Sequence, residues 1–301
     1  MVFAKERSRR RWVRSTSFVG YLLVAPAIGS LLIIIAYPLV LSIIMSFSDK
    51  TIGNPGKFVG LGNFKYLLQL PVFRIALTNS LLYTAVTVAL KLVLGLVFAL
   101  LLYNLPKTRQ FLVALALMPW FVPTSLTALM WWWMFNPLFG VFNRLLQNVG
   151  VAGIPWLSQP FWAKIAVMAV NIWRGIPFFA TCFLAGLLAI PRDYYEAAMI
   201  DGAGSFMRFW KITLPLLKTT IGVVVLYSII MTVADFEIVW LITKGGPQEA
   251  THLLGTLAYT VGLMSGRLGE GAATSLFLLP LLLLCSIWWL RSIRRSIRYE
   301  L

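Results

Sequence analysis

Long runs of apolar residues, separated by short polar segments, make up most of the chain. A helix needs about 20 residues to cross the hydrocarbon core of a bilayer. Runs that meet or exceed this length are residues 18–46, 75–103, 111–135, 162–189, 219–242 and 269–290. The pattern therefore predicts an all-α membrane protein with six transmembrane helices.

Composition supports this assignment. Hydrophobic residues make up 59% of the 301 residues and charged residues only 12%, compared with about 25% charged in a soluble domain. No stretch remains that is large enough for a separate soluble domain. Cys182 and Cys285 fall within apolar runs, where they offer neither a disulfide framework nor metal-ligand spacing.

The N-terminal residues 1–17 are strongly basic. They precede an apolar run that reaches Met45 and has no small-residue cleavage site at its end. A signal peptide has an apolar region of about 7–15 residues, so this run is too long to be one. We expect residues 1–17 to form a basic cytoplasmic tail and residues 18–46 to stay as the first transmembrane helix.

The distribution of Lys and Arg predicts the orientation. With six spans, 16 of these residues fall on the side that holds both termini, and 8 fall on the other side in longer loops. Positive charge accumulates on the cytoplasmic side of a membrane. Both termini and the loop 191–217 are therefore predicted to be cytoplasmic. This topology also accounts for the net charge of +16 without a nucleic-acid partner.

The loop 191–217 has the pattern of a helix, a turn and a second short helix. Asp193 and Glu196 suit a helix N-terminus, and Gly202 and Gly204 supply the turn. The loop also carries aromatic residues that it cannot bury by itself, namely Tyr194, Tyr195, Phe206, Phe209 and Trp210. An exposed element of this kind is typical of a docking surface.

The same loop resembles the EAA loop in membrane subunits of ABC importers. It has Glu-Ala-Ala at 196–198, Gly202 after three more residues, and Ile-Thr-Leu-Pro at 212–215 after nine more. In that family the loop is a cytoplasmic coupling helix that inserts into a cleft of the ATPase subunit. The resemblance assigns coupling to the ATPase to Glu196, Ala197, Ala198, Asp201, Gly202, Ile212, Leu214 and Pro215.

Two further motifs refine the resemblance. Residues 243–247 read Thr-Lys-Gly-Gly-Pro, with Thr251 and Leu254 downstream. This pattern is similar to the first membrane subunit of carbohydrate importers of the maltose and glycerol-phosphate type. A glycine-marked turn at 58–64 also recurs in sugar-importing members. The implied fold is the type I ABC importer (MetI-like) permease fold, with residues 75–290 as its transmembrane domain.

Ionisable residues at membrane depth are costly and are therefore candidates for function. Lys91, Arg174, Asp235, Glu237 and Glu270 fall within or at the ends of the predicted spans. We interpret Lys91 and Glu270 as structural, through pairing or by reaching an interface. His252, the only histidine, falls in an outer loop, where we expect no chemical role.

The resemblance also implies a substrate pocket in the third, fourth and fifth spans. Its contact positions here are Trp120, Thr124, Asn171, Arg174, Gly175, Phe178, Ser228, Met231, Thr232 and Asp235. A proline-kinked packing face and hydrogen bonds between helices would also explain several of these residues. For Arg174 we favour an ion pair with Asp235, which leaves a neutral pocket, over a direct grip on an anionic substrate.

The predicted function is the permease subunit of an ABC importer that moves a sugar or sugar-like solute by alternating access. Its partners would be a second membrane subunit, two ATP-binding subunits and an extracytoplasmic substrate-binding protein. The chain has no G-x-x-x-x-G-K-[ST] motif, so it needs no cofactor of its own, and the partner subunits bind ATP and Mg²⁺.

Two other classes of protein fit the sequence less well. An ion-gradient-driven secondary transporter is the alternative, with Arg174, Asp235 and Glu237 as coupling charges, but it leaves the EAA loop unexplained. An intramembrane enzyme would need a nucleophile with a base, or metal ligands, which the sequence does not supply.

Overall fold

The computed structural model describes residues 16–280, 282–284, 286, 287, 289 and 291. Within these residues it contains helices and two isolated β-bridges, Ser48–Phe58 and Thr51–Asn54. The basic tail at residues 1–15, Cys285 and most of the C-terminal arginines lie outside the described residues.

The helices in chain order are α2 Thr16–Leu31, η1 Leu32–Ala36, α3 Tyr37–Ser46, α4 Gly62–Gln69, α5 Pro71–Tyr103, α6 Arg109–Phe121, α7 Thr124–Met134, α8 Val141–Asn148, α9 Pro160–Ala189, α10 Asp193–Ile200, α11 Ser205–Arg208, η2 Phe209–Thr213, α12 Leu214–Val233, α13 Glu237–Thr243, α14 Leu254–Tyr259, η3 Thr260–Met264 and α15 Leu268–Leu276. The π-helical segments η1, η2 and η3 continue the helices next to them.

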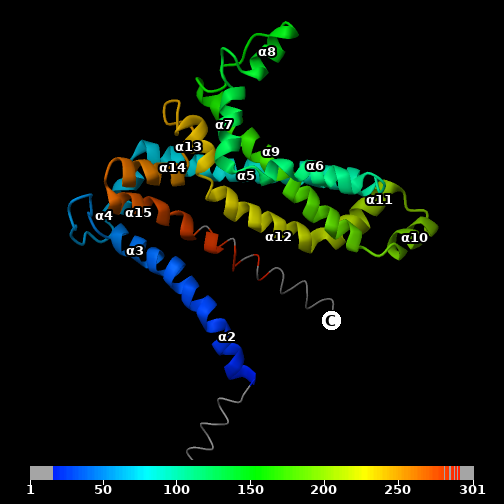
Figure 1. Ribbon diagram of the computed structural model, residues 1–301, viewed down its shortest axis with the longest axis horizontal. Helices are drawn as coiled ribbons and strands as arrows, with labels where there is room; N and C mark the ends of the chain where they lie inside the picture. Colours follow the sequence, from blue (N-terminus) through cyan, green and yellow to red (C-terminus); the bar gives the residue numbers. More distant parts are fainter. Residues whose placement is uncertain (1–15, 281, 285, 288, 290, 292–301) are drawn as a thin grey trace, which may run out of the picture.

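Four helices form the body of the molecule. α5, α6, α9 and α12 lie along its long axis, and α9 contacts each of the other three (Figure 1). Large side chains from α5, α9 and α12 form the core between them, including Val88, Phe179, Phe183 and Leu217. Gly95 on α5 permits this packing, because a Cβ atom there would lie 2.4 Å from the Cβ of Phe179.

The first helix leaves this body. α2, η1 and α3 extend from it as an arm, and only the last part of the arm packs on α15 (Figure 1). Residues Val19–Ser46 are apolar, and among them only Ser46 is buried. Such a surface requires lipid or another protein around it.

The third predicted span is not one straight helix. α6 and α7 are bent by 90° at a break between them. Pro123 cannot donate a backbone hydrogen bond, and the residue before a proline avoids helical geometry; Val122 accordingly has ψ 130°. The expectation of a continuous helix over 111–135 was therefore wrong.

The fifth predicted span is also broken. α12 ends at Val233, and α13 starts at Glu237, so that Asp235 lies in the break. A continuous helix over 219–242 was expected, and this was wrong as well. By length and composition, the described residues contain four helices that could cross a membrane, or five if α6 and α7 count as one span.

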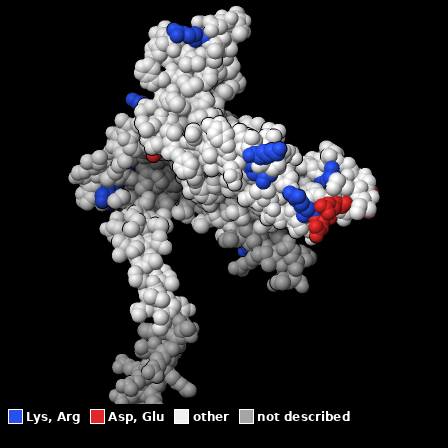
Figure 2. Space-filling view, turned by 45° about the vertical axis from the view of Figure 1, so that its right-hand side comes forward, with Lys and Arg blue, Asp and Glu red and all other residues white. Residues whose placement is uncertain are grey.

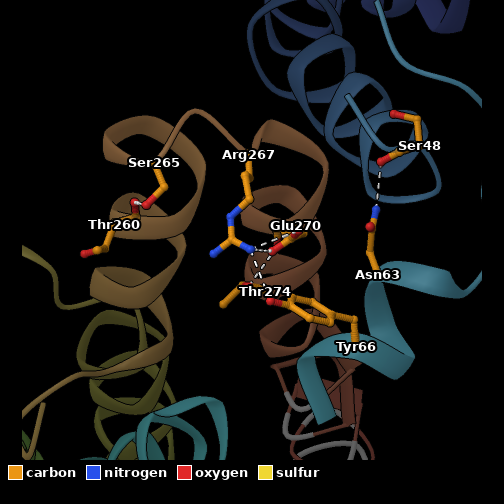
Figure 3. A network of polar contacts seen from close by, with 8 residues as sticks. All are labelled: Ser48, Asn63, Tyr66, Thr260, Ser265, Arg267, Glu270 and Thr274. Carbon is orange, nitrogen blue, oxygen red and sulfur yellow. Dashed lines mark hydrogen bonds and ion pairs between the residues drawn. The ribbon is translucent and has the colours of Figure 1, made fainter. Parts of the chain in front are cut away.

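A polar network holds the arm to the body at one end of the molecule (Figure 3). Asn63, at the start of α4, donates hydrogen bonds from Nδ2 to the carbonyl oxygens of Ser46 and Ser48, both at 2.8 Å. Arg267 and Glu270 form an ion pair of 3.0 Å. The glycine-marked turn at 58–64 thus positions Asn63 to cap the end of α3. Glu270 pairs with Arg267, in agreement with the structural role expected for it.

The Thr-Lys-Gly-Gly-Pro motif also has a structural explanation. Gly245 has φ +90°, and a Cβ atom there would lie 2.3 Å from the ring of His252. Thr251 Oγ1 donates to the carbonyl oxygen of Gly246 at 2.7 Å. His252 is 6% exposed, and its Nδ1 lies 3.0 Å from Thr256 Oγ1. The motif therefore builds a turn that packs against a buried histidine.

Candidate functional site

A cavity of 720 Å³ lies in the body of the molecule, where the broken spans meet α5 and α9. It brings together all ten of the residues that the sequence assigned to a substrate pocket: Trp120, Thr124, Asn171, Arg174, Gly175, Phe178, Ser228, Met231, Thr232 and Asp235. The sequence interpretation missed other lining residues: Lys91, Phe121, Phe179, Tyr227, Ala234, Phe236, Glu237 and Ile238.

Both helix breaks open onto this cavity. Thr124 is the first residue of α7, and Asp235 lies between α12 and α13. Non-helical backbone at membrane depth is tolerated where it faces protein or a water-filled cavity. The fourth span has no such break, because α9 continues as a helix through Gly175 and Pro177.

A chain of buried hydrogen bonds joins three elements at the cavity wall. Lys91 on α5 donates from Nζ to Asn171 Oδ1 and to Thr232 Oγ1, both at 2.9 Å. Asn171 Nδ2 donates to Asp235 Oδ2 at 2.8 Å, and the Tyr83 hydroxyl donates to the same oxygen at 2.7 Å. We call these five residues the Lys91–Asp235 network. It links α5, α9, the end of α12 and the break that follows α12.

The network depends on the missing side chain of Gly175. A Cβ atom at that position would lie 2.2 Å from Cδ of Lys91. Lys91 is 4% exposed, and its stem passes over Gly175 to reach its two acceptors. The structural role expected for Lys91 agrees with this geometry. Its position on the cavity wall was missed, although a lysine at membrane depth together with Asn171 and Asp235 in other spans was a signal for it.

Arg174 does not pair with Asp235, contrary to our expectation. The only ion pair between described residues is the one that joins Arg267 and Glu270. The Arg174 Nε is buried and has no hydrogen-bond partner among the described residues. Asp235 Oδ2 is instead taken by Tyr83 and Asn171. A guanidinium therefore remains on the cavity wall without an anion.

Aromatic rings form another part of the wall. Trp120 and Phe178 stack with their centroids 5.8 Å apart and an interplanar angle of 19°. Phe178 also contacts Tyr227, with a centroid distance of 4.9 Å. Because Trp120 remains 41% exposed, it keeps surface for a further contact. A cavity with aromatic faces and a few polar groups is suited to a small polar organic molecule.

The loop 191–217 forms the far end of the molecule (Figure 1). None of the residues of α10 is buried, and Glu196, Ala197, Asp201 and Gly202 are all exposed. Acidic side chains gather at this end beside basic ones, including Asp193 and Glu196 in the first turn of α10 (Figure 2). The expected helix, turn and second helix are present, because α11 follows α10 after the turn.

The turn and the junction with α12 hold α10 in place. Gly202 has φ +77°, which favours glycine. The Tyr195 hydroxyl lies 3.0 Å from Thr213 Oγ1, and Thr213 is buried. Thr213 lies inside the Ile-Thr-Leu-Pro motif, where Ile212 and Leu214 are half-buried and Pro215 is exposed; Ala198 on α10 is also half-buried. The sequence interpretation missed this Tyr195–Thr213 contact.

A helical membrane protein with a polar cavity between broken spans and an exposed helical loop at one end has the organisation of a transport subunit. Residues 91–299 match the family described as binding-protein-dependent transport system inner membrane component. The chain belongs to this family, and it is a permease subunit of an ABC importer, as the resemblance predicted.

Relatives of known sequence cover nearly the whole chain. The sulfoquinovosyl glycerol transport system permease protein SmoG of Agrobacterium fabrum is 36% identical over 98% of this chain and 97% of its own length. The trehalose/maltose transport system permease protein MalF of Thermococcus litoralis is 37% identical over 91% of this chain and 92% of its own. The sn-glycerol-3-phosphate transport system permease protein UgpA of Agrobacterium fabrum is 30% identical over 93% of this chain and 96% of its own.

Solved structures show the same fold. A chain of a bacterial ABC transporter that imports the acidic polysaccharide alginate superposes with a TM-score of 0.83, at 23% identity, over 96% of this chain and 99% of that one. The MetNI methionine ABC transporter gives a TM-score of 0.56 at 19% identity, over 78% of this chain and 98% of that one. The fold is therefore the MetI-like ABC importer permease fold.

Proposed function

We propose that this subunit moves a sugar or sugar-like solute through the 720 Å³ cavity by alternating access, driven by ATPase subunits that act on the loop 191–217. The observation that carries the proposal is the cavity itself, because all ten residues expected in a substrate pocket line it. The names of the relatives support a carbohydrate, since they include trehalose/maltose and sulfoquinovosyl glycerol systems.

The proposed topology has six spans in the inner membrane, with both termini and the loop 191–217 in the cytoplasm. The distribution of Lys and Arg supports it, with 16 on that side and 8 on the other. The proposed sixth span, 269–290, starts in α15, which belongs to a shorter apolar helix, and α14 with η3 forms a separate short apolar helix that packs against it.

The proposed assembly contains a second membrane subunit, two ATP-binding subunits and an extracytoplasmic substrate-binding protein. The exposed α10 and its neighbouring aromatic side chains, Phe206 and Trp210, support docking of an ATPase. Apart from the buried Ser46, the arm Val19–Ser46 is available to lipid or to the second membrane subunit. In this assembly the partner subunits bind ATP and Mg²⁺, and this chain binds no cofactor.

Transport in a purified system tests the proposal. The chain is co-expressed with the second membrane subunit, the ATPase subunits and the binding protein of its system, and the complex is reconstituted in proteoliposomes. We expect uptake of at least one of maltose, trehalose, glycerol 3-phosphate and sulfoquinovosyl glycerol when ATP is enclosed with the ATPase subunits. Uptake that follows a proton or sodium gradient and ignores ATP would contradict the proposal and favour a secondary transporter.

A further inference from the structure

We propose that Arg174 binds an anionic group of the transported molecule, so that the cavity accepts a sugar that carries a sulfonate, carboxylate or phosphate. This inference rests on the proposed function of the cavity and assigns its substrate class. It starts from the charges on the cavity wall, which are those of Lys91, Arg174, Asp235 and Glu237.

Lys91 and Asp235 satisfy one another through neutral partners. Asn171 accepts from Lys91 and donates to Asp235, while Thr232 and Tyr83 complete the Lys91–Asp235 network. A buried cation and a half-buried carboxylate joined in this way need no further counter-ion. The network therefore removes these two charges from those that a substrate meets.

Arg174 stays unsatisfied. Its Nε is buried without a hydrogen bond among the described residues, and no described carboxylate lies within ion-pair distance of it. A guanidinium has five N–H donors and no acceptor, so an incoming anion is the partner that its chemistry lacks. Its planar fork binds two oxygens of a carboxylate, sulfonate or phosphate at once.

Glu237 is the remaining charge on the wall. It is exposed and belongs to the first turn of α13, where the helix dipole stabilises a carboxylate. It forms no ion pair with a described residue. Glu237 is therefore stabilised without Arg174 and does not neutralise it.

Two neighbouring features fit the same ligand. Thr124 lines the cavity as the first residue of the 11-residue helix α7, so the positive end of that helix lies at the wall. Phe178 is four residues from Arg174 on α9, and both therefore share one helical face. The stacked Trp120 and Phe178 then offer an apolar surface to a sugar ring whose anionic group lies at Arg174.

The test uses the reconstituted transporter with its binding protein. Uptake of labelled sulfoquinovosyl glycerol and glycerol 3-phosphate is compared with that of maltose and trehalose. We expect the wild type to take up an anionic compound, and Arg174→Gln to lower this uptake about tenfold or more, because hydrogen bonds to charged groups are the strong ones. Arg174→Lys keeps the charge but loses the fork, so we expect intermediate uptake.

Controls separate this role from a structural one. Arg144→Gln removes the same charge from an exposed position on α8, outside the cavity, and should transport normally. ATPase stimulation by the loaded binding protein should persist in Arg174→Gln, which shows that coupling is intact. Rescue of Arg174→Gln by Asp235→Asn would overturn the proposal, because it would indicate an Arg174–Asp235 pair.

Different results would contradict the assigned substrate class and the proposed function. ATP-driven uptake of only maltose or trehalose, unchanged in Arg174→Gln, would overturn the inference about Arg174 and leave the sugar-permease function standing. Uptake that is independent of ATP would contradict the proposed function itself.

Discussion

Replacing Gly175 with alanine should break the Lys91–Asp235 network without touching any of its hydrogen-bonding groups. The added Cβ would lie 2.2 Å from Cδ, 3.2 Å from Cγ and 3.4 Å from Cε of Lys91. Both ends of that side chain are fixed, one by α5 and the other by Asn171 and Thr232 at 2.9 Å. The stem therefore cannot move aside while Nζ keeps its acceptors.

The size of the expected destabilisation follows from the clash and from these two hydrogen bonds. Hydrogen bonds to charged groups are worth about 1.5–3 kcal/mol each, and overpacking a core costs about 1–3 kcal/mol. We therefore expect Gly175→Ala to lower the free energy of unfolding by about 3 kcal/mol. At about 2.1 cal/mol/K of unfolding entropy per residue, this corresponds for the 301 residues to a fall in Tm of about 5 °C.

A double-mutant cycle with Lys91→Ala isolates the cause. Without the Lys91 stem the clash disappears, and Gly175→Ala should then be neutral or stabilise α9 by up to about 1 kcal/mol, as alanine does within a helix. Thermal unfolding of the purified full-length chain in detergent, followed by tryptophan fluorescence, measures all four proteins.

The matched control is Gly29→Ala in α2, since a Cβ atom there has nothing within 4 Å. It should leave Tm unchanged or raise it slightly. If Gly175→Ala lowers Tm equally in the wild type and in Lys91→Ala, the contact between Gly175 and Lys91 is not what requires the glycine, and the reasoning is refuted.

Three further predictions concern other parts of the chain. Gly202→Val should express normally but abolish ATP-driven uptake, because a φ of +77° strains a β-branched residue. Gly204→Val is the control and should be tolerated, because Gly204 has φ −67°. Equal uptake by the two variants would refute the role of the turn. The topology is tested in a chain whose Cys182 and Cys285 have been replaced. A cysteine introduced at Gly62 or Gln248 should react with an impermeant thiol reagent from outside, and one at Ser205 should not. The opposite labelling would reverse the proposed topology. Burial lowers the pKa of His252, so its contribution to stability should be fully present above about pH 6.5 and should be lost as the pH falls through the lower folded-state pKa. Tm measured from pH 8 to 5 would show this loss. An equal dependence of Tm on pH in His252→Gln would assign the loss to another group.

The sequence predicted where helices lie but not where they break. Apolar runs identified the cores of α5, α9 and α12 because burial in lipid or protein needs the same composition. Pro123 marks the bend between α6 and α7, so that break had a local signal. No proline or glycine lies at 234–236, so composition alone gave no reason for a break between α12 and α13.

The candidate pocket shows a similar limit. The resemblance identified ten residues that do line one cavity, because the family's contact positions carry over one by one along the chain. They did not reveal partners across helices. Tyr83 and Lys91 lie on α5, which carries none of those ten residues, and both became visible as network members only once α5 was packed against α9 and α12.

The wrong pairing of Arg174 with Asp235 has a physical origin in Gly175. The resemblance placed Asp235 on a helix facing Arg174, which suggested an ion pair between them. A contact from Lys91 to the same region needs room for its side chain to pass α9. Gly175 provides that path, since only a residue without a side chain leaves room for the Lys91 stem. Lys91 reaches Asn171, Asn171 and Tyr83 bind Asp235, and Arg174 is left at the cavity wall without a partner. A glycine beside Arg174 thereby determines which of two cations a substrate meets.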